Sequence, residues 1–195
     1  MTSAVGGSGP CVGMLELASI VAGIEIADAL SKEADIDLVT TRAVSPGKYL
    51  ILFTGPVEEV SSAMRRGTEV GGGFLIDQLS IPNLEPTLYD LIVGQNEGRN
   101  PPITDLDAVG LIETLSVAST IRAADIASKT ASLTLVRLAL ARGIGGKSWV
   151  AFTGEVSDVE AGVSAGAANA EAVGLLVARV VIPSPHGNLQ QVLGE

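Results

Sequence analysis

The chain has 195 residues, of which 47% are hydrophobic and 17% charged, with a mean hydropathy of +0.43. This composition excludes an intrinsically disordered chain and supplies enough apolar surface for one large core or two small ones. The net charge is −10 and the sequence has no run of Lys or Arg, so it lacks the basic patch by which proteins bind nucleic acid.

The signals for compartment are few. Cys11 is the only cysteine, so no internal disulfide can form, and a cytoplasmic location fits best. The first ten residues do not resemble a secretory signal. No apolar run approaches the roughly 20 residues of a membrane span. We therefore expect a soluble protein with no membrane partner.

The first half of the chain predicts six elements and then a linker. Apolar spacing indicates strands at 12–17, 36–44, 48–55 and 74–82, and helices at 19–34 and 56–71. Ser19 stands where a side chain can cap the first helical turn. The segment 93–107, which reads VGQNEGRNPPITDLD, is rich in Asn, Gly and Pro, and this composition indicates a linker.

The second half predicts the same six elements in the same order. The expected strands are 109–114, 133–141, 147–154 and 175–183, and the expected helices are 116–131, opened by Ser116, and 155–174. Residues 12–39 and 109–136 align without a gap and are identical at 12 of 28 positions. Residues 47–60 and 146–159 match at 7 of 14 positions. This is a tandem duplication, because solenoid repeats are shorter and more numerous.

The duplication predicts the fold class and the domains. Each copy has the order β-α-β-β-α-β, which is typical of an α+β sandwich with an antiparallel sheet packed against helices. We expect a first domain at 1–94, whose residues 1–10 are flexible, a linker at 95–106 and a second domain at 107–195.

One stretch suggests a nucleotide-binding loop, namely LARGIGGKSWVAF at 140–152. A phosphate loop needs a helix directly after its lysine, because the helix N-terminus holds the phosphates. Here Trp149, Val150 and Phe152 indicate a strand instead, and the first copy has Tyr49 where Ser148 stands. We therefore interpret the loop as a hairpin connection. If the protein bound ATP or GTP and Lys147→Ala abolished that binding, the hypothesis of a nucleotide hydrolase would be restored.

The ordered motifs resemble the bacterial microcompartment (BMC) shell-protein family. The first copy carries VGMLEL, GIEIADALSK, FTGPVEEV and a closing IP; the second carries VGLIET, AADIASK, GIGGK, FTGEVSDVEAGVSAGAANAE and VVIPSPH. Two such domains in one chain are similar to the tandem (BMC-T) subclass, in unpermuted order. The resemblance implies a structural protein without enzymatic activity, whose homotrimer imitates a six-domain hexamer.

The resemblance also implies which residues surround a central pore. In the family the loop between the second and third strands does so, and it maps to Val44, Ser45, Pro46 and Gly47 in the first copy and to Gly143, Ile144, Gly145 and Gly146 in the second. Glycine suits such crowding because it allows close backbone approach. The alternative is a pair of ordinary hairpin turns with no transport role.

The family's edge lysine, which meets its counterpart on the next hexagon, maps to Lys32 and Lys129. The alternative for each is an ordinary surface pair one helical turn from its acid, Asp28 or Asp125. The corner motif after Ile-Pro is incomplete, since the second copy has Ser184 in place of the usual Arg but keeps Pro185 and His186. The first copy has lost both the Arg and the His.

Cofactors and partners follow from the same resemblance. Some tandem members hold an iron–sulfur cluster through a pore-loop cysteine, but neither loop here has one, so we expect no cofactor and no metal. Expected partners are further copies, other shell proteins, encapsulated enzymes and small polar metabolites passing through the pore. The alternative is a soluble oligomer that binds a small ligand or has a regulatory role and does not tile.

Overall fold

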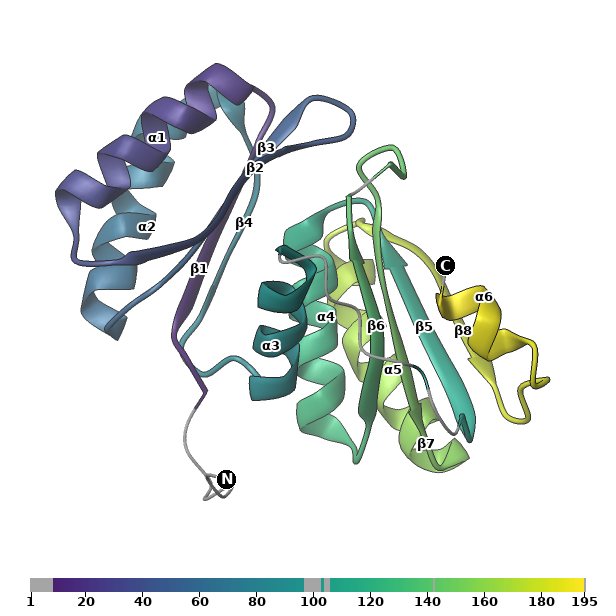
Figure 1. Ribbon diagram of the computed structural model, residues 1–195. Helices are drawn as coiled ribbons and strands as arrows, with labels where there is room; N and C mark the ends of the chain where they lie inside the picture. The colour runs from purple at the N-terminus through teal and green to yellow at the C-terminus, as the bar shows by residue number, and fades with distance from the viewer. Residues whose placement is uncertain (1–8, 97–102, 104–105, 142, 195) are drawn as a thin grey trace.

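The computed structural model describes residues 9–96, 103, 106–141 and 143–194, and these residues fold into two similar halves (Figure 1). The expected flexibility of residues 1–8 and most of the expected linker lie outside the described residues. The first half consists of β1 (Val12–Leu17), α1 (Ile20–Glu33), β2 (Asp37–Val44), β3 (Lys48–Thr54), α2 (Val57–Gly71), a 3₁₀ turn η1 (Gly72–Phe74), β4 (Leu75–Ile81) and α3 (Pro86–Asn96). The second consists of β5 (Ala108–Thr114), α4 (Val117–Thr130), β6 (Thr134–Leu140), β7 (Ser148–Gly154), α5 (Val156–Ala172), β8 (Leu176–Ile182) and α6 (Leu189–Gly194).

Each half contains one antiparallel four-stranded sheet. The strand orders are β2-β3-β1-β4 and β6-β7-β5-β8, so the two sheets have the same topology. The pairing register repeats as well, since Val12 lies opposite Thr54 in one sheet and Val109 lies opposite Thr153 in the other. The predicted α+β class and the unpermuted β-α-β-β-α-β order are confirmed.

Local sequence explains where the paired helices begin and how they pack. Ser19 and Ser116 have extended backbones, and their side chains accept hydrogen bonds from the amides of Ala22 and Ser119, as the capping prediction required. Glycine on α2 allows close packing against the sheet: a Cβ on Gly67 would lie 2.3 Å from Cδ1 of Leu15.

The halves stack as alternating layers (Figure 1). Helices α1 and α2 cover one face of the first sheet, and α3 and α4 lie against its other face. Helices α4 and α5 in turn cover one face of the second sheet, whose outer face carries α6. Helix α4 is therefore shared, because it packs on its own sheet and on the sheet of the first half.

Two helices were not anticipated from the sequence. Helix α3 extends into the segment 93–107 that the sequence analysis interprets as a linker, and α6 follows the last strand. Apolar side chains anchor both, with Leu88 and Ile92 of α3 and Leu193 of α6 buried against a sheet. Within the described part of the chain, no helix is long and apolar enough to cross a membrane.

Candidate functional site: hairpin loops and the seam between the halves

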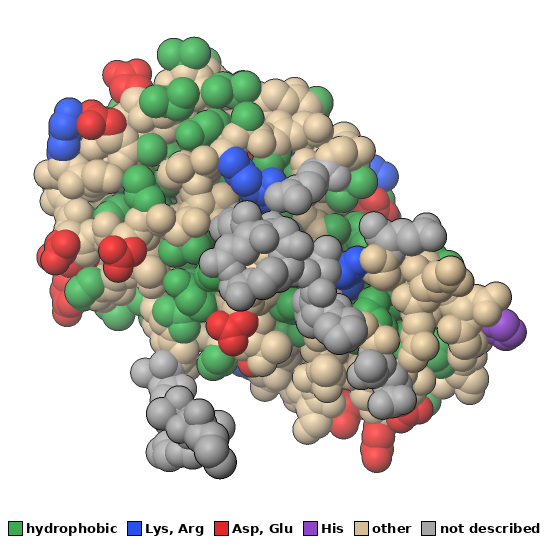
Figure 2. Space-filling view, in the orientation of Figure 1, with side chains coloured by type: hydrophobic (Ala, Val, Ile, Leu, Met, Phe, Trp, Pro, Cys, Tyr) green, Lys and Arg blue, Asp and Glu red, His purple; other side chains and the backbone are tan. Residues whose placement is uncertain are grey.

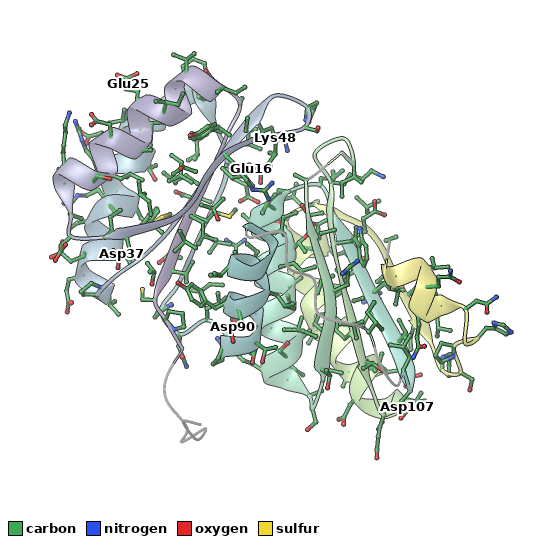
Figure 3. The ribbon with its side chains drawn as sticks, in the orientation of Figure 1. Glu16, Glu25, Asp37, Lys48, Asp90 and Asp107 are labelled. Carbon is green, nitrogen blue, oxygen red and sulfur yellow. The ribbon has the colours of Figure 1, made fainter. Side chains whose placement is uncertain are left out.

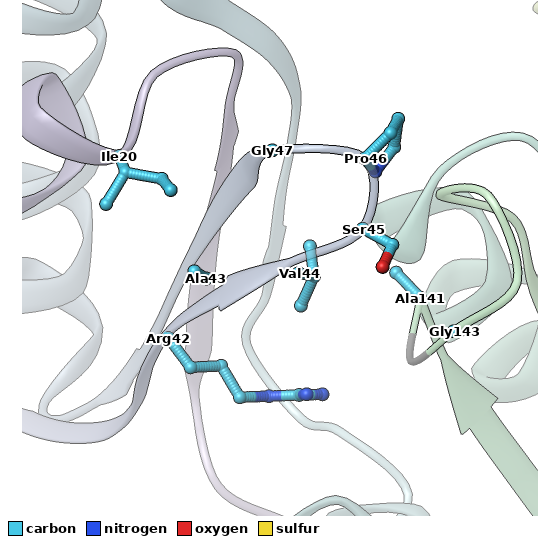
Figure 4. Close-up of a pocket in the computed structure, with 9 residues that line it drawn as sticks. All are labelled: Ile20, Arg42, Ala43, Val44, Ser45, Pro46, Gly47, Ala141 and Gly143. Atoms are coloured by element: carbon cyan, nitrogen blue, oxygen red, sulfur yellow. The ribbon is translucent and has the colours of Figure 1, made fainter.

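The two predicted pore loops lie next to each other, although about 100 residues separate them in sequence (Figure 4). The first connects β2 to β3 and the second connects β6 to β7. A Cβ built on Gly146 would lie 2.9 Å from Cδ of Pro46 and 3.2 Å from the carbonyl oxygen of Ser45. Only glycine fits there, because φ of Gly146 is also positive, at +84°.

An open recess of about 600 Å³ lies beside these loops. It is lined by both hairpins and by the first residue of α1, and Figure 4 shows Ser45 pointing toward Ala141. Pro46, Gly47, Gly143, Ile144 and Gly145 are exposed, whereas Val44 and Gly146 are buried. The loops therefore present to solvent mainly backbone, the Pro46 ring, the Ile144 side chain and the partly exposed Ser45 hydroxyl.

Below the loops, a buried carboxylate joins the halves. Glu16 of β1 accepts a hydrogen bond from Nζ of Lys48 at 2.7 Å and another from the backbone amide of Val117 at 2.9 Å. Val117 is the first residue of α4, where unpaired amides and the helix dipole favour a negative charge. Figure 3 shows Glu16 and Lys48 together at the boundary between the halves.

Burial raises the pKa of Glu16 above the ordinary carboxyl value. The Lys48 ammonium and the Val117 amide act in the opposite direction, since both stabilise the ionised carboxylate. Burial is the larger effect, so the ionised form is held at a cost inside the junction.

Further contacts continue along α4 and complete a seam, defined here as the contact of α4 with β1, β4 and the segment 83–85. Ser116 and Ser119 donate to the Asp77 carboxylate. Nη2 of Arg122 donates to the carbonyl oxygen of Gln78 at 2.7 Å, at the open edge of β4. Apolar residues from both halves fill the interior of the seam, among them Met14, Leu50, Leu79, Val117, Ala118 and Ile121.

The candidate edge lysines pair with the acids one helical turn before them in both copies. Nζ of Lys32 lies 2.5 Å from Oδ2 of Asp28, and both side chains are exposed. Nζ of Lys129 lies 2.8 Å from Oδ2 of Asp125, but this pair also joins the seam. Lys129 donates to the carbonyl oxygen of Asn83, and Asp125 accepts from the amide of Glu85. The second pair therefore has a role within the chain that the sequence analysis missed.

Equivalent surfaces outside the seam are uncovered. On α1, Val21 and Ile24 are 78% and 57% exposed, whereas their α4 counterparts Ala118 and Ile121 are fully buried. Ile20, Val21 and Ile24 are called the free face of α1, and Figure 2 shows hydrophobic side chains gathered on the surface above that helix.

The outer face of the second sheet is partly uncovered, beside the area that α6 covers. Val180 of β8 is 48% exposed, while its counterpart Leu79 of β4 is buried under α4. Leu111 and Trp149 are half-buried, whereas their counterparts Met14 and Leu50 are buried. Leu111, Trp149 and Val180 are called the free sheet face.

The loop that suggested a phosphate site does not form one. Ser148 begins β7, so a strand follows Lys147, and Nζ of Lys147 lies 3.1 Å from a carboxylate oxygen of Glu113. Among the described residues, no group of three or more His, Cys, Asp or Glu side chains is placed to hold a metal ion. Cys11 is a buried free thiol.

The fold and this site define a protein made of two fused copies of one α+β domain, joined through a buried seam. The BMC domain model matches the chain twice, over residues 11–84 and 108–185. The chain therefore belongs to the BMC domain family.

Individual relatives support this family assignment. The bacterial microcompartment shell protein PduT of Citrobacter freundii is 40% identical over 184 residues, covering 94% of this chain and 97% of PduT. The shell protein EutM of Salmonella typhimurium is 40% identical over 88 residues, covering 45% of this chain and 88% of EutM. A crystal structure of a microcompartment protein from Desulfitobacterium hafniense has a TM-score of 0.81 and 41% identity, covering 94% of this chain and 99% of that one.

Proposed function

We propose that this chain is a structural shell protein of a bacterial microcompartment, and that three copies close into a ring of six domains around a pore. The relatives named above supply the shell function, because the similarity to PduT spans nearly all of both chains. The family's role is structural, so we assign the chain no catalysis.

The main support for the ring is that equivalent surfaces of the two halves differ in exposure. The seam buries the outer face of the first sheet and one face of α4, yet it leaves the free sheet face and the free face of α1 uncovered. These two surfaces are the counterparts of those that already pack together. A second copy can therefore repeat the same contact, with its α1 on the second sheet of the first copy.

The polar part of the seam supports the same assembly. The Lys147–Glu113 pair repeats the Lys48–Glu16 pair at the equivalent position. Glu113 is half-exposed, and it would accept the amide of Ile20 from the next copy as Glu16 accepts that of Val117. Head-to-tail contacts of this kind close into a ring or continue as a filament, and the family resemblance favours closure at six domains.

Closure would bring six hairpin loops to one axis, three of each sequence. The pore would be lined by Ser45-Pro46-Gly47 alternating with Ile144-Gly145-Gly146. The adjacency of the two loops within one chain supports this arrangement, because it supplies one pair of neighbouring loops already assembled. We propose that small polar metabolites pass through the opening, and that Lys32 and Lys129 line the outer edges between tiles.

The test is the assembly of the purified full-length chain. Light scattering after size-exclusion chromatography should give three times the chain mass of 19.8 kDa, and electron microscopy should show hexagonal discs or sheets with partner shell proteins. A monomer at working concentration would contradict the ring. A discrete oligomer that never tiles would instead favour the soluble ligand-binding or regulatory alternative.

A further inference from the structure

The junction within the chain and the junction between copies differ at one charged position. Within the chain, Arg122 of α4 reaches the carbonyl oxygen of Gln78 on β4. The alignment of the two copies places Glu25 of α1 at the position of Arg122, and Arg179 of β8 at the position of Gln78. An acid therefore stands where the helix of the inner seam has an arginine, and a base stands on the strand that would receive it.

Neither side chain is engaged within one copy. Glu25 and Arg179 are exposed, and within the described residues neither forms an ion pair. Figure 3 shows Glu25 on the outer side of α1, away from the seam. The two residues cannot meet inside the chain, because α1 packs on the first sheet and Arg179 belongs to the second.

The position of Arg179 suits a partner that approaches as α4 does. Strand β8 is the edge strand of its sheet, like β4, so its outer side is open. The Arg179 side chain leaves β8 on the side of the sheet that α5 covers, as Gln78 leaves β4 on the side of α2, so it must fold over the open edge to reach a carboxylate on the next copy's α1. Glutamate is shorter than arginine, so the longer member of the pair stands on the strand and compensates for the shorter reach from the helix.

From these observations we infer that Glu25 of one copy pairs with Arg179 of the next, and that this ion pair selects the head-to-tail junction between copies. The inference rests on the proposed ring and adds to it the residues that recognise the partner. In the seam within the chain, Arg122 meets the neutral carbonyl of Gln78. Only the junction between copies would therefore contain two opposite charges at this position. Complementary charges across an interface mainly set specificity and salt dependence.

Charge exchange in the full-length protein tests the pair. Arg179→Glu should weaken association about tenfold or more per junction, because two carboxylates would then face each other. The double variant Glu25→Arg with Arg179→Glu should restore the trimer. Arg65→Glu is the matched control, since Arg65 is exposed on α2 and the substitution changes the net charge equally. Circular dichroism verifies that each variant folds.

The outcomes separate this inference from the proposed function. Dissociation of Arg179→Glu, rescue by the double variant and an unaffected Arg65→Glu together support the pair. A wild-type trimer that Arg179→Glu leaves as stable as the control overturns the pair and leaves the ring standing. Failure of the double variant to restore association overturns the pair as well. A monomeric wild type overturns the proposed ring, and the pair with it.

Discussion

Glu16 shows how a single residue can join two halves at an energetic cost. Its carboxylate is buried, holds Lys48 and caps α4. Because burial raises its pKa, the folded protein binds a proton at this site more readily than the unfolded chain does. Stability from this group is therefore greatest below the ordinary carboxyl pKa and is lost as pH rises through the raised value.

Replacing Glu16 with Gln tests this sign. The unfolding free energy of the wild type minus that of Glu16→Gln should fall as pH rises above the ordinary carboxyl pKa, and should level off above the raised one. Urea unfolding at intervals from about pH 4 to about pH 8 measures the difference, in which the other carboxyls cancel. A difference that rises with pH would mean that Lys48 and the Val117 amide outweigh burial.

At the level of elements, α1 and α4 have the same pattern but different surroundings. The sequence predicted both helices and their serine caps, because apolar spacing and capping are local signals. It could not predict which helix would be covered, since both have aliphatic residues at the equivalent positions 20, 24, 117 and 121. Coverage is decided by tertiary packing, which places α4 against the first sheet as well as its own.

The residues that the sequence analysis missed have the same explanation. Glu16, Asp77 and Arg122 act across the seam, and nothing local in sequence indicates a contact between residues about 40 to 100 positions apart. One signal was present, because Glu16 and Glu113 are identical at equivalent positions of the two copies. Helix α6 was missed because it has only 6 residues, and α3 because it runs into a segment rich in turn residues.

Matched substitutions on the two helices should separate assembly from folding. Ile24→Asp should leave the monomer within about 0.5 kcal/mol of wild-type stability and abolish the trimer, because Ile24 is exposed in one copy and covered only in the ring. Ile121→Asp should cost about 3 kcal/mol or more of unfolding free energy, because it buries an unpaired charge in the seam. Denaturation and light scattering measure both; equal effects on folding would contradict the assignment of the free face.

At the scale of the whole molecule, the pore assignment depends on where residue 145 lies in the ring. Gly145 is exposed, has φ of +65°, and a Cβ there would meet nothing within 4 Å in one copy. Gly145→Trp should therefore preserve the trimer at a backbone cost of about 1 to 2 kcal/mol while narrowing the axial opening. Cryo-electron microscopy of the ring measures the opening.

Gly174→Trp is the matched control for strain, because Gly174 has φ of +71° and equally open surroundings after α5. It should cost similar stability without changing the opening. If density for the indole introduced by Gly145→Trp lies on the outer rim, the hairpins do not surround the axis.

The tile edges are tested on the same scale. Lys32→Ala removes an exposed pair worth only a few tenths of a kcal/mol, so the trimer should remain intact. If Lys32 meets its counterpart across the edge, sheet formation should be lost, as seen by negative-stain microscopy. Arg65→Ala serves as the surface control, and unchanged tiling in Lys32→Ala would leave the pair with Asp28 as an ordinary surface contact.

The buried seam within each chain has a consequence for how the ring forms in dilute solution. Fusion makes every second junction intramolecular, so its effective concentration does not change when the protein is diluted. A six-domain ring built from separate domains must bring six molecules together, whereas this chain needs only three. The amount of ring should therefore depend on a lower power of the protein concentration. Complete rings can then form at a level of expression at which unfused domains would remain dissociated.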